Sequence, residues 1–517
     1  MKIFIDNFLG GISDSDRIGT QGSYYVGFGV NPINPYHYGY LTAGGITTTL
    51  TNTSSQINSM TIAPAPSNVI DVYAIEGDGN RIHKIKDAAT VPDWVNGTEY
   101  PFTISNTTHI GHTTVIGEDI KTYSLGTTNY ILYSWNDNAD GDIGIVNIEG
   151  AATFDSKFVS REMSGGQVLQ KAFPHPMIEW GESGMLYVAD GRNIHQIDGQ
   201  GGGRGVFTPQ KLQLPYGWVA NSFFDAGDFL GITAQRYLKA GWGEDLGRGK
   251  SAVFFWDGSS PIFNKRIFLE EPTIVASISV NGNYYVFCID ATRDGIIKGW
   301  DGNGFKTLKR IIGNVATTGS STLRRFPSNY GGVDVFGDKI LITQAGSGTI
   351  GNGEVFLYDP NTNSLYSPII STSPTQTRIR SVLSVGLTGV LLSSNSNITG
   401  ETSICYSSLS GTDNPNFLYK SLYYEFPQRA IVKYIKVYFK TLTAGQGVDV
   451  IADMDYGKKI TQAGNISYAE DGAITTKRLA LNEDCNSIRV VVQKDEGSGV
   501  KIGKIVIDYD FADSDIK

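Results

Sequence analysis

The sequence predicts an all-β fold in which a β-propeller, with seven as the favoured number of blades, is followed by a small jelly-roll-like β-sandwich. Three observations predict it. A strand-and-turn phrase returns at regular intervals through the middle of the chain, glycine is frequent while long amphipathic helices are not evident, and the C-terminal region alternates apolar with polar residues. We therefore expect an extended N-terminal arm or docking segment at 1–65, the propeller at 66–415 and the sandwich at 416–517.

The repeated phrase is an apolar run that ends in an aromatic or aliphatic residue and continues into a carboxylate and a Gly or Pro turn. Its clearest copies lie at 194–199, 254–258, 298–302 and 356–360. Asp-Gly and Asp-Pro steps turn a strand back, so each copy predicts a hairpin. Weaker copies near 87 and 408 are six intervals apart, which gives about 54 residues per repeat, close to the period of long propeller blades. Coincidental strand–turn pairs in one large sandwich are the alternative.

The composition is that of a β-rich protein held by tight turns. Glycine makes up 62 of 517 residues, a share above the usual value of about 7%. The net charge is −9 and no long basic run occurs, which argues against nucleic acid as a partner. No apolar stretch reaches the roughly 18 residues of a membrane span. Cys288, Cys405 and Cys485 lie far apart in or beside strand patterns, so we expect buried free thiols.

The first 65 residues break the repeat. A strand is expected at 2–8, and Gly-rich and then Thr/Ser/Asn-rich stretches follow it. This region is interpreted as an arm that lies along the propeller or along a neighbouring subunit. A strand that closes the propeller ring and a flexible lead-in are the two alternatives.

The C-terminal region has strict period-two patterning. Ile435, Val437 and Phe439 alternate with the polar or amphipathic residues at 434, 436, 438 and 440, and similar runs lie at 448–455, 488–493 and 505–511. Alternation of this kind marks half-buried antiparallel strands. Several such runs close together predict a small sandwich of the jelly-roll type.

One loop carries the residues of a candidate metal site. Residues 136–142 concentrate oxygen ligands around Gly141, and Asp137, Asp140 and Asp142 are the calcium candidates. Alternate oxygen-bearing residues with glycine at the sixth place fit the start of a calcium loop. The twelfth place holds Asn147, where a bidentate Glu is expected, so a polar turn between strands is the competing interpretation.

No catalytic or cofactor-binding residue is assigned, and we expect a protein that is not an enzyme. The Ser-x-Asp-x-Gly-x-Thr-Trp series of sialidases, Gly-x-Ser-x-Gly and His-Glu-x-x-His do not occur. The Asp residues follow the turns, where backbone hydrogen bonding explains them. A propeller glycosidase remains the alternative, because carboxylates on separate blades form no local motif.

The segments at 8–13 (Phe-Leu-Gly-Gly-Ile-Ser) and 22–25 (Gly-Ser-Tyr-Tyr), together with the C-terminal strands, resemble structural proteins of tailed-bacteriophage virions. The resemblance implies a tail or accessory component of the virion that contacts other virion proteins, forms a symmetric homo-oligomer and touches host-surface glycan. It carries over no functional residue. A glycan-binding adhesin-type module is the alternative function, since fold alone does not separate the two roles.

Overall fold

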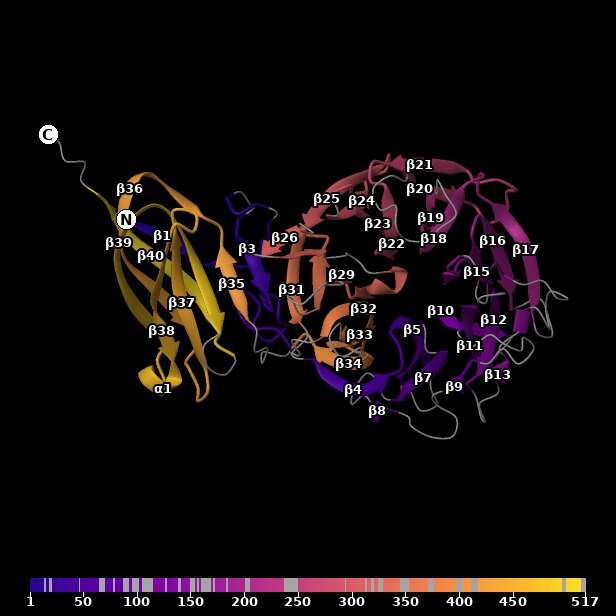
Figure 1. The fold of residues 1–517 in the computed structure, drawn as a ribbon, viewed down its shortest axis with the longest axis horizontal. Coiled ribbons are helices and arrows are strands. Elements are labelled where there is room, and N and C mark those ends of the chain that lie inside the picture. Colours follow the sequence, from indigo (N-terminus) through magenta and orange to yellow (C-terminus); the bar gives the residue numbers. More distant parts are fainter. Residues whose placement is uncertain are drawn as a thin grey trace. The chain divides into compact units, whose positions relative to one another are not determined.

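The computed structural model (Figure 1) describes residues 1–13, 15–17, 21–45, 47–64, 70–77, 80–86, 93–94, 102–104, 115–125, 128–137, 141–148, 154–155, 158–159, 169–170, 173–182, 185–199, 205–236, 250–292, 294–311, 314–317, 320–323, 329–344, 353–370, 376–396, 402–410, 417–494 and 499–512. The chain divides into two compact units. The first comprises residues 1–47, 354–373 and 407–517, and the second comprises residues 48–353 and 374–406.

The prediction of an all-β protein with a seven-bladed propeller is confirmed. In the described part of the chain, one sheet of five strands and six sheets of four strands form the blades (Figure 1). The strands of the first four blades are β5 (Ile57–Pro64), β6 (Ile70–Glu76), β7 (Arg81–Lys86), β8 (Asp93–Trp94) and β9 (Phe102–Thr103); β10 (Ile116–Leu125), β11 (Thr128–Asn136), β12 (Gly141–Asn147) and β13 (Phe154–Asp155); β14 (Met177–Glu179), β15 (Met185–Asp190), β16 (Asn193–Asp198) and β17 (Val206–Gln213); and β18 (Trp218–Asp225), β19 (Leu230–Arg236), β20 (Lys250–Trp256) and β21 (Lys265–Leu269).

The remaining three blades follow the same antiparallel plan. Their strands are β22 (Thr273–Val280), β23 (Asn283–Ile289), β24 (Gly295–Trp300) and β25 (Phe305–Ile311); β28 (Val333–Phe336), β29 (Lys339–Gln344), β30 (Glu354–Asp359) and β31 (Ser364–Ile370); and β32 (Gln376–Val385), β33 (Gly389–Ser396), β34 (Thr402–Ser408) and β4 (Thr48–Thr53). The first strand of each blade contacts the first strand of the next blade, and β32 contacts β5. These seven strands therefore form a closed inner ring.

The ring is closed by a strand from the start of the chain. β4 pairs antiparallel with β34, with Thr53 opposite Thr402 and Thr51 opposite Ile404. Thr402 Oγ1 also donates a hydrogen bond to the Thr53 carbonyl at 2.7 Å. The alternative in which an N-terminal strand closes the propeller is thus the one that the structure contains. The last blade is completed by residues that are about 350 positions away in sequence.

β-Bulges recur in the inner strands and place polar side chains between blades. Register shifts fall at Asn58 in β5, at residues 118–119 in β10, at Asn221 in β18 and at residues 380–381 in β32. Asn58 Nδ2 donates to the Gly117 carbonyl of the next blade at 2.6 Å, and Asn221 Nδ2 donates to the Ile274 carbonyl at 2.9 Å. A bulge bends its strand and redirects a side chain, so it lets one inner strand bind the backbone of the next.

The apolar cores lie between neighbouring blades. One buried cluster joins Tyr187 and Ile194 of the third blade to Trp218, Phe254 and Trp256 of the fourth. Tyr187 and Trp256 meet edge to face with ring centroids 5.7 Å apart. Each blade is too small to bury its faces alone, and stacking against both neighbours buries them.

A nine-stranded sheet belongs to the other unit. Its order is β1-β40-β36-β39-β35-β3-β2, and β37 and β38 extend it from β39. The strands are β1 (Lys2–Ile5), β2 (Gly11–Ile12), β3 (Ser23–Phe28), β35 (Leu418–Ser421), β36 (Tyr424–Phe439), β37 (Gly447–Met454), β38 (Lys459–Ser467), β39 (Thr476–Lys494) and β40 (Ile502–Phe511). Ile435, Val437 and Phe439 are buried, as their alternation predicts. Hydrogen bonds join all nine strands into one sheet, so the two facing sheets of a jelly roll stay a prediction.

The predicted domain boundaries differ from those of the compact units. Residues 1–65 do not form a single arm, because β1, β2 and β3 are strands of the nine-stranded sheet whereas β4 and β5 belong to the propeller. The unit that holds most of the propeller begins at 48 rather than 66, and the other unit includes residues 354–373 and then 407–517 rather than 416–517. The sheet to which a short strand belongs depends on the distant strand with which it pairs. The residue pattern within the short strand does not specify that partner.

The remaining described elements are small. They are the hairpin β26 (Asn314–Thr317) and β27 (Ser320–Leu323), the 3₁₀ turn Tyr330–Gly332 and the helix α1 (Tyr468–Asp471). Among the residues described, no helix has the length and apolar character needed to cross a membrane. All three cysteines are buried free thiols, as predicted.

Candidate interaction surface

The calcium candidates lie at the hairpin that joins β11 to β12. Asp137 and Asp142 are buried, whereas Asp140 lies outside the described residues. Asp142 Oδ1 accepts a hydrogen bond from the Ile143 amide at 2.7 Å, a role that a turn carboxylate plays without a metal. The residues that the structure describes contain no group of three or more His, Cys, Asp or Glu side chains arranged to hold a metal ion. Calcium binding at this loop stays a prediction.

Two carboxylates of the inner ring, the buried Asp119 and the partly buried Asp334, bind the backbone of the following blade. Asp119 of β10 accepts from Ser59 Oγ at 2.5 Å and, through its other oxygen, from the Met177 amide at 2.8 Å. Asp334 of β28 accepts from the Ser384 amide at 2.6 Å, and burial raises the pKa of this carboxyl to about 6. Each carboxylate satisfies an inner-strand amide and so holds neighbouring blades together.

Glu118, beside Asp119, is the most perturbed acid of the inner ring. Asn136 Nδ2 donates to Glu118 Oε1 at 2.6 Å, and Tyr330 Oη donates to the Glu118 carbonyl at 2.5 Å. Burial, with a smaller contribution from the neighbouring Asp119, raises the pKa of Glu118 to about 8 against the opposing effects of Asn136 and Arg380. The carboxyl is therefore protonated at neutral pH, and it binds Asn136 in that form.

Glu118 should make the stability of the protein depend on pH. Its ordinary pKa is 4.5, so between that value and about 8 the folded protein holds a proton that the unfolded chain has lost. Stability from this group is complete below that window and falls as pH rises through it. We expect wild type to lose about 1–2 kcal/mol relative to Glu118→Gln between pH 5 and pH 8, after allowance for partial exposure. Urea denaturation at both pH values measures this difference, and parallel curves for the two proteins would contradict it.

The outward face of the nine-stranded sheet carries aromatic and basic side chains in rows. In one row Phe4 of β1 lies opposite Val506 of β40, which lies opposite Lys436 of β36, which lies opposite Arg478 of β39. Directly opposed residues of antiparallel strands point to the same face, and so do residues two apart on one strand. The aromatic–basic face is defined here as Phe4, Tyr434, Lys436, Tyr438, Arg478 and Lys504.

Cations stack on each aromatic ring of this face. Arg478 Cζ lies 3.6 Å from the Tyr434 ring centroid, Lys436 Nζ lies 4.6 Å from that of Tyr438, and Lys504 Nζ lies 4.4 Å from that of Phe4. Phe4 remains 53% exposed. Exposed contacts of this type are worth about 0.5–1 kcal/mol each, and they hold the side chains flat against the sheet. The result is a preorganised surface on which large rings are open to solvent.

The sequence contained the signal for part of this face, although no residue of the face was assigned to a site. The polar partners of the period-two pattern in β36 alternate tyrosine with lysine at 434, 436, 438 and 440. That pattern predicts which residues point outward. It does not predict that Phe4, Arg478 and Lys504 lie beside them, because β36 pairs with the later strands β39 and β40, and β40 in turn pairs with β1 from the start of the chain.

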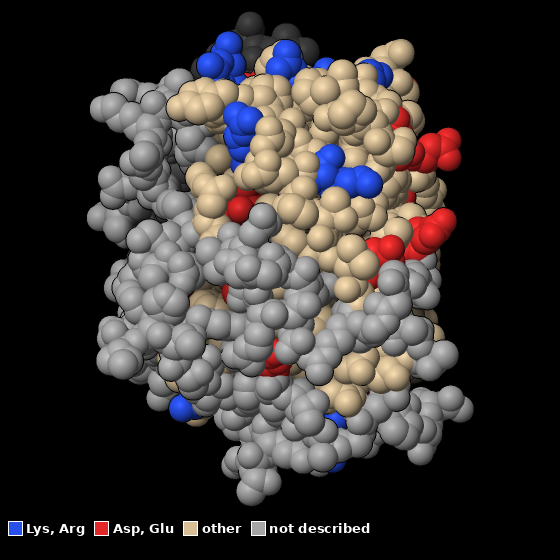
Figure 2. Space-filling view, turned by 90° about the vertical axis from the view of Figure 1, so that its right-hand side faces the viewer, with Lys and Arg blue, Asp and Glu red and all other residues tan. Residues whose placement is uncertain are grey.

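Basic side chains do not gather on the side of the propeller that Figure 2 shows as they do on the aromatic–basic face, as far as the described residues there are concerned. The Lys and Arg side chains described there are scattered among uncharged residues and form no continuous basic patch. Proteins that follow a phosphate backbone carry such a patch or stripe. The visible described surface therefore gives no support to nucleic acid as a partner.

Comparison with known proteins gives structural neighbours only. No family model and no curated protein matches the chain. The Dos1 propeller is similar at 10% identity and a TM-score of 0.41, over 71% of this chain and 95% of that one. Raptor from Chaetomium thermophilum is 14% identical with a TM-score of 0.40, over 71% of this chain and 29% of that one. An exo-β-1,3-galactanase from Phanerochaete chrysosporium is 10% identical with a TM-score of 0.32, over 91% and 100%. No function follows from similarity at this level.

Proposed function

We propose that this protein is a non-catalytic structural component of a tailed-phage virion, which assembles with neighbouring copies and other virion proteins through the aromatic–basic face. The observation that carries the proposal is that face: Phe4, at 53%, and Tyr438, at 37%, are exposed on the nine-stranded sheet. Aromatic residues and arginine are enriched where proteins bind one another, and lysine-flanked rings suit a partner with acidic groups. The resemblance of residues 8–13 and 22–25 to virion proteins supports the setting.

Assembly would remove the exposed rings from water. Burying an aromatic side chain contributes roughly 1.5–3 kcal/mol when it leaves water completely. Several rings on one face therefore supply the centre of an interface, while charged residues around them, such as Lys2 with Asp508, would form its polar rim. A propeller glycosidase is not proposed, because Asp119 and Asp334 are engaged in holding blades together.

A glycan-binding role is the second candidate, and the same rings favour it. Exposed aromatic rings stack on the apolar faces of sugars, and cations beside them suit acidic saccharides. This role needs no second copy of the chain. It also places contact with a host surface on the nine-stranded sheet rather than on the propeller.

The double variant Phe4→Ser/Tyr438→Ser tests both roles. We expect light scattering to give a defined multimer for wild type at micromolar concentration, and a tenfold or greater weakening of self-association in the variant, because about 1.4 kcal/mol corresponds to a factor of ten. Tyr216→Ser, which changes an 88% exposed tyrosine of the propeller, is the matched control and should leave the mass unchanged.

Other outcomes separate the two roles. If light scattering shows wild type to be a monomer at ~100 µM, the protein does not self-associate through this face. Binding to a glycan array that the double variant loses and Tyr216→Ser keeps would then favour the glycan-binding role. A wild-type monomer with no variant-sensitive glycan binding would contradict the proposal for the aromatic–basic face.

A further inference from the structure

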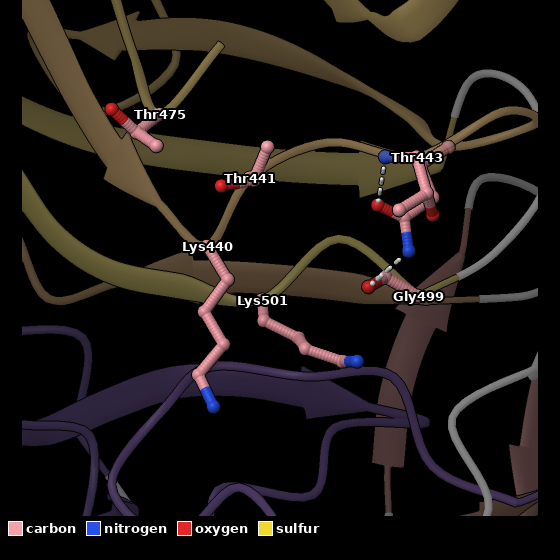
Figure 3. Close-up of a pocket in the computed structure, with 7 residues that line it drawn as sticks. Lys440, Thr441, Thr443, Thr475, Gly499 and Lys501 are labelled. Carbon is pink, nitrogen blue, oxygen red and sulfur yellow. Dashed lines mark hydrogen bonds between the residues drawn. The ribbon is translucent and has the colours of Figure 1, made fainter. Parts of the chain in front are cut away.

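A pocket of about 450 Å³ lies in the unit that contains the nine-stranded sheet, beyond the end of β36 (Figure 3). It is lined by Lys440, Thr441, Thr443, Gln446, Thr475, Gly499 and Lys501. The lining residues come from three segments: the turn after β36, the residue before β39, and the residues before β40. The pocket is separate from the six residues of the aromatic–basic face.

The wall of the pocket is held in place by one glutamine. The Thr443 amide donates to Gln446 Oε1 at 3.0 Å, and Gln446 Nε2 donates to the Gly499 carbonyl at 3.0 Å. Figure 3 shows both bonds: the first lies within the turn at 443–446, and the second joins that turn to Gly499. The side-chain oxygen and nitrogen of Gln446 thus both bind backbone groups that line the pocket. The site is preorganised before any ligand arrives.

Two lysines give the pocket its charge. The Lys440 amide donates to the Lys501 carbonyl at 2.9 Å, which ties the two backbones together. In Figure 3 the Lys440 side chain points downward and the Lys501 side chain points to the right. Among the described residues that line the pocket, none is acidic. The chain as a whole carries 51 acidic and 42 basic residues, so its net charge is negative. The described lining of this pocket is basic instead.

Several other basic residues of the same sheet form ion pairs, whereas Lys436 and Arg478 stack on aromatic rings. Those with a carboxylate partner are Lys2, Arg429, Lys433, Lys459, Lys477, Arg489 and Lys504. Within the part of the chain that is described, no ion pair joins Lys440 or Lys501 to a carboxylate. An anion in the pocket would meet two ammonium groups that have no carboxylate partner among the described residues.

A histidine and a tyrosine stand beside Lys440. Lys440 Nζ lies 3.4 Å from His37 Nδ1 and 4.7 Å from the ring centroid of Tyr40. Burial lowers the pKa of His37, and Lys501 and Lys440 lower it further. The neutral imidazole accepts from Lys440 and leaves that ammonium two further donors.

We propose that this pocket binds an oxyanion group: a sulfate, phosphate or carboxylate, free or at the end of an acidic saccharide. Lys440 and Lys501 neutralise its charge, and the hydroxyls of Thr441, Thr443 and Thr475 donate to its oxygens. Charge-assisted hydrogen bonds of this kind are about twice as strong as neutral ones. The inference stands without the proposed function, because it concerns a different set of residues and a ligand that can be added alone.

Isothermal titration of the full chain with sodium sulfate, sodium phosphate, glucuronate and glucose 6-sulfate, at constant ionic strength, tests the pocket. We expect at least one of them to bind wild type with one site per chain. Lys440→Gln and Lys501→Gln should each weaken binding by about tenfold, and the double variant by about a hundredfold. Lys433→Gln, which changes an exposed lysine of β36 outside the pocket, is the matched control and should bind as wild type.

The pattern of binding identifies the source of the group. Inorganic anions alone would mark a site for free phosphate or sulfate, and tighter binding of the saccharides would mark a glycan terminus. The inference is overturned if none of the four ligands binds wild type. It is equally overturned if Lys433→Gln weakens binding as much as the two pocket variants, since the effect would then be one of general surface charge.

Discussion

Replacement of Asp119 by alanine is expected to lower the free energy of unfolding by about 3–5 kcal/mol, the largest effect of any single substitution proposed for this protein. The side chain is 1% exposed and accepts from Ser59 Oγ, from the Ile120 amide and from the Met177 amide. These donors lie on three different blades. Alanine leaves them buried without an acceptor, and each unsatisfied buried donor costs roughly 1–3 kcal/mol.

Urea denaturation followed by tryptophan fluorescence measures this effect. Asp119→Asn, which keeps the shape and one acceptor oxygen, should lie between alanine and wild type. Asp228→Ala changes an exposed aspartate in the turn between β18 and β19 and is the matched control. If Asp119→Ala and Asp228→Ala unfold at the same urea concentration, the carboxylate does not hold the blades together.

Two prolines in β4 are expected to open the propeller ring. Thr49 and Thr51 lie on either side of a register shift in the β4–β34 pair, so the variant Thr49→Pro/Thr51→Pro removes two amide donors from the strand that completes the last blade. Proline cannot donate to a β-ladder. We expect a loss of about 2–4 kcal/mol, together with faster unfolding, because closure joins the first and last parts of the propeller.

Limited proteolysis and thermal denaturation measure the opening. The control is Thr49→Ala/Thr51→Ala, which removes the same side chains and keeps both amides. New cleavage near β4 and a lower melting temperature in the proline variant alone would support closure by this strand. Equal behaviour of the two double variants would show that β4 adds little to the ring.

The repeat in the middle of the chain was sufficient to predict the propeller and its seven blades. Strand-and-turn phrases such as 254–258 and 298–302 are local, since an apolar run and an Asp-Gly turn require only neighbouring residues. The phrases fall at the ends of β20 and β24, the third strands of their blades. Regular spacing then implied the stacking of equal units.

The candidate surfaces could be predicted only in part. Alternation in β36 predicts which of its residues are buried and which face outward, and the buried set is confirmed. The pocket at Lys440 and Lys501 left no local signal, because the two lysines are 61 positions apart in sequence and meet through a backbone hydrogen bond. Asp137 and Asp142 lie at the connection between β11 and β12, where a polar turn between strands is the alternative to a calcium site.

Residue patterns within short segments predicted the all-β class, the repeating blade, the buried cysteines and the inward face of the C-terminal strands. Strand partnership between distant segments accounts for the rest. β1 joins β40, β4 joins β34 and Asp119 binds the amide of Met177, and each of these pairings depends on the completed fold. Every strand presents the same backbone amides and carbonyls to a partner. Its own residues therefore indicate that it will pair, but not with which strand. Packing of the whole chain selects the partner.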